Sequence, residues 1–125
     1  MRRRIGSFLL TLAVLLAMFP TAAVPVRAES GTWDGTVADV YAGGSGTEAD
    51  PYRIATGAQL AYLAQQVNGG TYYSGYYFLL TSDIDLNNQT WIPIGNYSSS
   101  YGRFSGSLDG GGHTISNLYI SSSIY

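Results

Sequence analysis

The 125-residue chain contains no cysteine and no lysine, and its only histidine is His113. Without cysteine there is no disulfide framework of the kind that small exported domains often use, so stability must come from packing, metal or assembly. A lone histidine, with neither a second ligand nor a nucleophile beside it, is weak support for a zinc site or for catalysis. We therefore expect no cofactor and no enzymatic activity.

Positive charge is concentrated at the N-terminus, where three arginines at positions 2–4 precede an apolar run over residues 8–19. A basic start, about a dozen apolar residues and small residues before a cut are typical of a secretory signal peptide. The run is shorter than the roughly 20 residues that a membrane span needs. We expect residues 1–28 to be the signal peptide, cleaved after Ala28 or, as second choice, after Ala23. The mature chain is then secreted or at the cell surface, without membrane insertion.

Residues 29–125 keep only two arginines against eight acidic residues, which leaves this part with a net charge of −6. Nucleic acids and anionic membranes are bound through dense clusters of lysine and arginine. The acidic, lysine-free composition therefore argues against both as partners. A part of this length can support one modest hydrophobic core.

Residues 29–48 are rich in Gly, Ser and Thr and contain only isolated apolar residues. We expect an extended or irregular lead-in there, without packing of its own. Asp50-Pro51 is typical of a turn, and Tyr52–Ile54 alternates as a short extended segment with its two end residues on one face.

One amphipathic helix is predicted over residues 56–67. Its apolar stripe has the i, i+3, i+4, i+7 spacing and consists of Leu60, Leu63, Ala64 and Val67. Thr56 followed by Gln59 matches a capping box, and Asn68-Gly69-Gly70 supplies residues that commonly end helices. A helix of about three turns cannot bury its stripe alone, so it must lie on an apolar surface.

From Tyr72 onward the apolar period falls from 3.6 to 2, which predicts short strands between Gly, Ser and Asn breaks. The breaks are not evenly matched two-residue turns, so a coil of strands is favoured over hairpins. The apolar residues expected to point inward are Phe78, Leu80, Ile84, Leu86, Ile92, Ile94, Phe104, Leu108, Ile115, Leu118 and Ile120.

Three stretches carry a family resemblance: GGSGTEADPYRIATGAQLAYLAQQVNGG, YYFLLTSDIDLNNQTWIPIGN and GRFSGSLDGGGHTISNLYI. Their order over residues 43–120 resembles the N-terminal part of bacterial surface proteins with GLUG motifs, a pectin-lyase-like, right-handed parallel β-helix family. The Gly-Leu-Val-Gly-like repeats of that family do not occur here. The resemblance implies an all-β solenoid whose amphipathic helix caps the open end of the first coil, a device that covers unpaired strand edges.

The resemblance also divides the chain. We expect a cap with the helix over residues 49–70 and the first one to two coils over residues 71–125, truncated there, because stacked repeats usually need about three units. The residues expected to hold this fold together are Thr56, Gln59, Leu60, Leu63, Val67, Ile84, Leu86, Trp91, Phe104, Leu108, Asp109, Gly110, Ile115 and Leu118.

Asp83 and Asp85 alternate along the sequence DIDLN and are weak candidates for a calcium site. An EF-hand loop would place glycine at its sixth position and glutamate at its twelfth, where this chain has Asn88 and Ile94. We therefore expect a strand whose two aspartates point outward, and no metal site.

Asp109, the three glycines 110–112 and His113 invite a catalytic or phosphate-binding interpretation. The residues that follow are strand-like, so the glycines open no helix that could cradle phosphate. Calcium-binding nonapeptide repeats place their aspartate after the glycines, whereas Asp109 precedes them. We interpret residues 109–112 as a corner, where glycine supplies positive φ and aspartate bonds nearby amides. His113 at its exit should tolerate replacement by Asn.

Tyr72, Tyr73, Tyr76 and Tyr77 are weak candidates for ligand binding, because exposed tyrosines stack on sugars, although alternation turns some of the four inward. The resemblance implies an exported, non-enzymatic β-helix scaffold that is adhesive or contacts carbohydrate. Its partners would be extracellular carbohydrate, a host or neighbouring cell surface, and further coils of the same chain. The alternative is the N-terminal fragment of a β-helix polysaccharide lyase or glycoside hydrolase whose catalytic residues lie beyond residue 125, since fold alone does not decide function.

Overall fold

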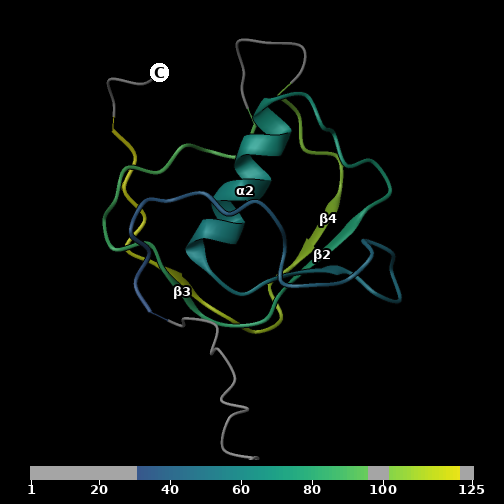
Figure 1. Ribbon diagram of the computed structural model, residues 1–125, viewed down its shortest axis with the longest axis horizontal. Helices are drawn as coiled ribbons and strands as arrows, with labels where there is room; N and C mark the ends of the chain where they lie inside the picture. The colour runs from purple at the N-terminus through teal and green to yellow at the C-terminus, as the bar shows by residue number, and fades with distance from the viewer. Residues whose placement is uncertain (1–30, 96–101, 122–125) are drawn as a thin grey trace, which may run out of the picture.

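A computed structural model describes residues 31–95 and 102–121, so the expected signal peptide and its cleavage site lie outside the described residues. The elements in chain order are β1 (Tyr52–Ile54), α2 (Gly57–Asn68), β2 (Tyr77–Leu80), β3 (Ile84–Asp85), β4 (Ser107–Asp109) and β5 (Ile115–Ser116). Figure 1 shows the chain winding as a ring with α2 across its middle. No helix within the described ranges is long and apolar enough to cross a membrane.

Every strand pair in the described residues is parallel. β2 lies between β1 and β4, with Phe78 opposite both Tyr52 and Leu108. β3 pairs with β5, with Ile84 opposite Ile115. Parallel strands need long crossover connections, whereas antiparallel neighbours can be joined by hairpins. The expectation of strands without hairpins is confirmed for this part of the chain.

Two segments run beside each other over most of their length, and we call residues 77–91 the inner segment and residues 107–119 the outer segment. Besides the β2–β4 and β3–β5 pairs, an isolated parallel bridge joins Thr90 to Tyr119. On its other edge the inner segment pairs with β1, and a further parallel bridge joins Asp85 to Thr32. The inner segment therefore has neighbours on both edges.

Helix α2 begins and ends at local signals. The Thr56 hydroxyl accepts a hydrogen bond from the Gln59 N–H at 3.2 Å, which confirms Thr56 as the N-cap. The Gln59 side chain accepts from the N–H of Ala55 at 2.8 Å, one residue before the partner that a capping box has. Gly69 caps the C-terminus with φ −85°, and Gly70 then takes φ +110°.

The apolar stripe of α2 packs into one core with the lead-in, β1 and the inner segment. The largest fully buried side chains are Phe78, Ile54, Leu63, Leu86 and Val67. Full burial of a side chain of this size contributes about 1.5–3 kcal/mol. The complete core consists of Trp33, Ile54, Leu60, Ala61, Leu63, Ala64, Val67, Phe78, Leu80, Ile84, Leu86 and Trp91.

The expectation of an unpacked lead-in is wrong at Trp33. This side chain is 7% exposed, and its ring meets Trp91 edge to face with centroids 5.5 Å apart. The backbone N–H of Trp33 donates to the carbonyl of Asp85 at 2.9 Å, and its indole N–H donates to the carbonyl of Thr36 at 2.7 Å. A Cβ on Gly57 would lie only 2.6 Å from the Trp33 side chain. The backbone there is irregular, as expected, but glycine at the start of α2 leaves room for Trp33 to enter the core.

The strand expected around Ile92 and Ile94 is also wrong. Neither residue belongs to a strand, Ile92 is 59% exposed, and Ile94 is only partly buried. Pro93 between them has no N–H to donate to a ladder, which explains why the pairing stops at Thr90.

The outer segment is more exposed than its apolar pattern predicts. Leu108, Ile115, Leu118 and Ile120 were expected to point inward, yet between 39% and 56% of each side chain is exposed. Leu108 lies beside buried Phe78, and Ile115 lies beside buried Ile84, so register places them on the inward side of their ladders. They are exposed because no further segment of the described chain covers them. Phe104, just before β4, is partly buried against Phe78.

Candidate functional site

Five tyrosines from separate parts of the chain gather at one end of the core, and we call them the tyrosine cluster: Tyr41, Tyr52, Tyr62, Tyr73 and Tyr76. They come from the lead-in, β1, α2 and the connection from α2 to β2. Tyr41 is central, with ring centroids 4.9 Å from Tyr52, 5.0 Å from Tyr62 and 6.4 Å from Tyr73. The rings therefore pack against one another and, through Tyr41, Tyr52 and Tyr73, against Phe78.

Two hydroxyls of the cluster form a pair. The Tyr41 and Tyr73 oxygens are 2.9 Å apart. Burial raises the pKa of Tyr41 far above its ordinary value, with a further rise from the bond to Tyr73, and burial also raises the pKa of Tyr73. Both phenols are therefore neutral at physiological pH. One of them donates within the pair, and the accepting hydroxyl keeps its own hydrogen for another partner.

A hollow of about 330 Å³ opens beside these rings. Its lining combines tyrosine rings and hydroxyls, one carboxylate and glycine backbone, and consists of Asp39, Val40, Tyr41, Gly43, Gly44, Tyr52, Tyr62 and Tyr73. At Gly44, where φ is +94°, a Cβ would lie 1.9 Å from the carbonyl oxygen of Pro51. Only glycine lets the backbone pass this close, so the wall of the hollow depends on that residue.

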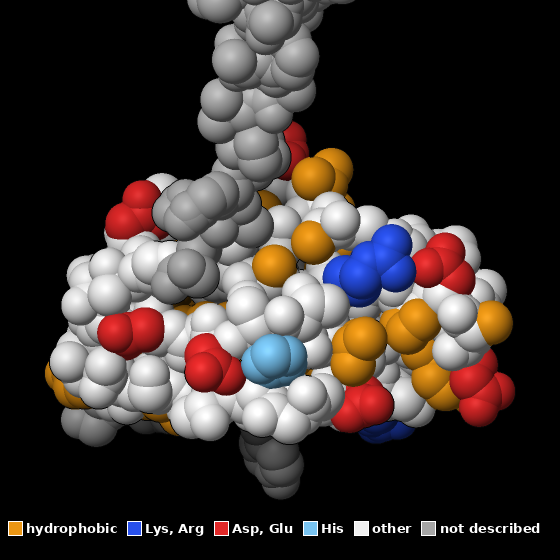
Figure 2. All heavy atoms as spheres, turned by 90° about the horizontal axis from the view of Figure 1, so that it is seen from below, with side chains coloured by type: hydrophobic (Ala, Val, Ile, Leu, Met, Phe, Trp, Pro, Cys, Tyr) orange, Lys and Arg blue, Asp and Glu red, His pale blue; other side chains and the backbone are white. Residues whose placement is uncertain are grey.

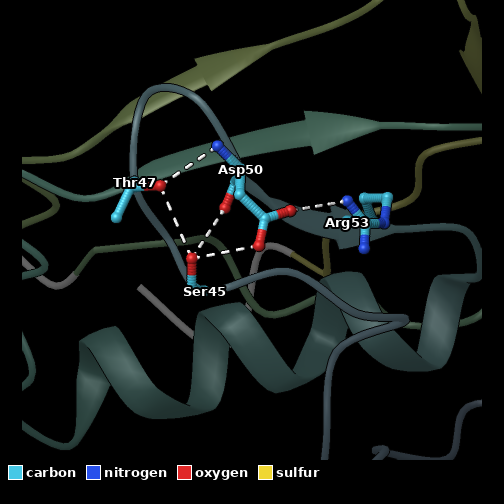
Figure 3. A network of polar contacts seen from close by, with 4 residues as sticks. All are labelled: Ser45, Thr47, Asp50 and Arg53. Atoms are coloured by element: carbon cyan, nitrogen blue, oxygen red, sulfur yellow. Dashed lines mark hydrogen bonds and ion pairs between the residues drawn. The ribbon is translucent and has the colours of Figure 1, made fainter.

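The loop next to this wall is fixed by the polar network of Figure 3. The Asp50 carboxylate accepts from Arg53 and from the Ser45 hydroxyl, each at 3.0 Å, and the Asp50 N–H donates to the Thr47 hydroxyl at 3.0 Å. The Asp50 carbonyl also accepts from the N–H groups of Ser45 and Gly46. The bond to Arg53, followed by the one to Ser45, lowers the pKa of Asp50. The loop is thus held in one shape.

A second polar group joins the inner and outer segments. The Asp83 carboxylate accepts from the Thr114 N–H at 3.0 Å and lies 3.2 Å from His113 Nδ1. These two partners, Thr114 first, lower the pKa of Asp83. Figure 2 shows the histidine beside an acidic side chain, on a face that also carries other acidic side chains and a basic one.

Asp85, two residues further along the inner segment, also bonds to the outer segment. Its carboxylate accepts from the Asn117 amide and from the Asn87 N–H, each at 2.8 Å. These bonds, Asn117 first, lower the pKa of Asp85. Asn87 and Asn117 both have positive φ, near +55°, which asparagine tolerates better than most residues.

The two aspartates of the inner segment and the glycine corner all have hydrogen-bond partners within the protein. Asp83 and Asp85 flank buried Ile84 and bond across the segments, and the described residues contain no group of three or more His, Cys, Asp or Glu that could hold a metal. Asp109 accepts from the Gly111 N–H at 2.9 Å, and Gly111 has φ +59°. These are the bond and the backbone angle expected for a corner. The contact of His113 with Asp83 was not anticipated, because it joins residues 30 positions apart.

The structure separates the four tyrosines that the sequence singled out. Tyr73 lines the hollow, and Tyr76 stacks on Tyr52 with ring centroids 6.0 Å apart. Tyr72 is 40% exposed and Tyr77 is partly buried in β2, and neither lines the hollow.

Sequence reasoning missed three members of the cluster. Tyr52 carried a signal, because it alternates with buried Ile54. Tyr62 lies beside the apolar stripe of α2 and Tyr41 stands alone in a polar stretch, so no local pattern marks either of them.

Comparison with known proteins gives relatives but no family. No family model matches the chain, and no solved structure matches it. A protein of Evansella cellulosilytica described as a Gly-rich membrane protein is 36% identical over 87 residues, which are 65% of this chain and 9% of that protein. Halomucin of Haloquadratum walsbyi is 36% identical over 96 residues, 70% of this chain and 1% of halomucin. The chain thus spans a small fraction of the length of these relatives, one of which is described as a membrane protein.

Proposed function

We propose that the described residues are the start of a right-handed parallel β-helix, with α2 as the cap over its first coil. The observation that supports this is the even spacing of three parallel contacts between the inner and outer segments. Phe78 and Leu108 are 30 positions apart, Ile84 and Ile115 are 31, and Thr90 and Tyr119 are 29. Nearly equal spacing at three places is what a solenoid of stacked coils requires. The right hand follows from the strong preference of parallel crossovers.

We further propose that the chain is a non-enzymatic scaffold at the cell surface, adhesive or in contact with carbohydrate. Three observations support this role: a basic and apolar N-terminus typical of export, relatives many times longer than this chain, and the description of one of them as a membrane protein. Stacked coils rise by about 4.8 Å each and present a long face on which contacts can be repeated.

Amide hydrogen exchange measured by NMR tests the fold. The N–H groups of Ile84, Leu86 and Trp91 donate to carbonyls of the outer segment at 2.8–2.9 Å, so they should exchange slowly. The amide of Ile92, just beyond the last bridge, is the internal control and should exchange faster. Cross-strand contacts typical of antiparallel pairs would contradict the β-helix.

Export is tested separately. The full chain with a C-terminal tag should be reached by protease added to intact cells, whereas a variant without residues 1–28 should stay protected inside. Protection of both forms would contradict a surface location.

A further inference from the structure

We propose that the hollow beside the tyrosine cluster binds one uncharged sugar unit of an extracellular polysaccharide. This inference rests on the proposed surface function and deepens it, because it assigns the ligand class to particular residues.

The size of the hollow favours a single ring. Its volume of about 330 Å³ is at the low end of the roughly 300–1,000 Å³ that small-molecule sites occupy. A hexose ring fits a space of this order, whereas several sugar units of a chain do not. The open side of the hollow leaves room for the rest of a polysaccharide to continue into solvent.

The chemistry of the lining matches the two sides of a sugar. A pyranose ring presents an apolar C–H face and a rim of hydroxyls. Tyr52 and Tyr62 bring partly buried rings to the hollow, while the Tyr41–Tyr73 hydroxyl pair, the exposed Asp39 carboxylate and the backbone of Gly43 and Gly44 bring hydrogen-bonding groups. Aromatic side chains with a polar tip suit a ligand of this mixed character.

Charged ligands fit less well. Among the described residues that line the hollow, the only charged group is the Asp39 carboxylate, which repels anions, and the chain after residue 28 has a net charge of −6. A quaternary ammonium group needs aromatic rings around an empty centre. Here Tyr41 fills the centre of the cluster, within 5.0 Å of the rings of both Tyr52 and Tyr62.

The hollow is also prearranged. The Asp50 network fixes the loop beside Gly43 and Gly44, and the hydroxyl bond fixes Tyr41 against Tyr73. A site whose loop and side chains are already ordered loses less entropy when it binds. Even so, a ligand of a dozen heavy atoms should bind with a dissociation constant of about 1 mM.

NMR titration of the exported chain with methyl glycosides of glucose, galactose, mannose and N-acetylglucosamine tests the inference. At least one glycoside should shift the ring signals of Tyr62 and Tyr73 and the amide signals of Gly43 and Gly44, with half-saturation at about 1 mM ligand. Tyr62→Ala should weaken binding at least about tenfold, since stacking is lost, whereas Tyr62→Phe should retain most of it.

Two further variants test the contribution of a hydroxyl to sugar binding and provide a control outside the hollow. Tyr73→Phe keeps the ring and removes one hydroxyl, so it should weaken binding several-fold while the fold persists. Tyr72→Ala is the matched control, because Tyr72 is exposed near the cluster but does not line the hollow, and it should bind like the parent chain.

Three results would overturn the inference: no shift with any neutral glycoside, tighter binding of choline or a sialic acid than of every neutral sugar, or equal loss in Tyr62→Ala and Tyr72→Ala. These failures are distinct from failure of the proposed function. A chain that is exported and protects the Ile84 and Leu86 amides, but binds no sugar, would keep the scaffold and lose only this site.

Discussion

The inner and outer segments have the same apolar alternation but differ sharply in burial. Phe78 and Ile84 are 1% and 2% exposed, whereas their ladder partners Leu108 and Ile115 are 40% and 39% exposed. The inner segment has a parallel neighbour on each edge, and the outer segment has a described neighbour on only one. In stacked structures each unit is stabilised by its neighbours. The same sequence pattern therefore yields a core in one place and a surface in the other.

The largest expected effect comes from removing a core ring of the inner segment. Phe78→Ala should lower the free energy of unfolding by about 3–5 kcal/mol, because a buried ring is lost and a cavity remains. Leu108→Ala, at the paired position of the outer segment, should cost about 1 kcal/mol, because much of that side chain is already in water. Urea unfolding followed by tryptophan fluorescence measures both. Equal losses would mean that the two segments are packed alike.

Two glycine-to-alanine substitutions compare the closely packed core at the start of α2 with the exposed outer segment. Gly57→Ala would place a methyl group 2.6 Å from the Trp33 side chain, and overpacking of this kind costs about 1–3 kcal/mol. Gly110→Ala in the outer segment meets no atom within 4 Å and lies outside the positive-φ region, so its cost should be small.

Thermal unfolding of the two alanine variants gives the comparison. The Gly57 variant should melt several degrees below the parent and the Gly110 variant close to it. If Gly57→Ala were neutral, the close packing of Trp33 against the start of α2 would be wrong.

The sequence predicts the burial of some of these residues but not of others. Thr56, the Leu60–Val67 stripe and the Ile84–Leu86 alternation are local signals, and the structure shows the cap and the buried residues that they predict. Trp33 gave no such signal, because its burial depends on the glycine at position 57 and on Trp91 far along the chain. Burial of the outer segment depends on neighbours rather than on its own pattern.

The candidate site was harder to predict than the core. The hollow exists because register and crossover bring Tyr41, Tyr52, Tyr62 and Tyr73 together from four places. Periodicity assigns a residue to a face, but it does not say which faces converge. The tyrosine-rich stretch at positions 72–77 therefore predicted the correct part of the molecule, but only one of its residues, Tyr73, lines the hollow.

A smaller effect is expected from acid, which acts on the contacts between the segments. The pKa values of Asp83 and Asp85 are lowered in the folded chain, so their contribution to stability is present above the unfolded value near 3.9 and is lost as pH falls through the folded pKa. Below about pH 4 the outer segment should loosen before the inner one, because the bonds to Thr114 and Asn117 weaken.

The measurement is the free energy of unfolding between pH 6 and pH 3 for the parent chain and for Asp85→Asn. The lowered pKa values of Asp34 and Asp50 also contribute to the parent curve, so the difference between the two chains isolates Asp85. Asp85→Asn should show a shallower loss of stability in acid. Parallel curves would show that Asp85 does not link the segments electrostatically.

The smallest effect is expected at His113. Its Nδ1 lies 3.2 Å from Asp83 in an exposed pair, and such pairs contribute little. Asp83 keeps its bond from the Thr114 N–H when the imidazole is removed, so His113→Asn should leave the melting temperature within experimental error at pH 7. Asp83→Ala removes the acceptor of both contacts and should lower the melting temperature more than His113→Asn does. If the order were reversed, the imidazole rather than the backbone bond would join the outer segment to the inner one at this corner.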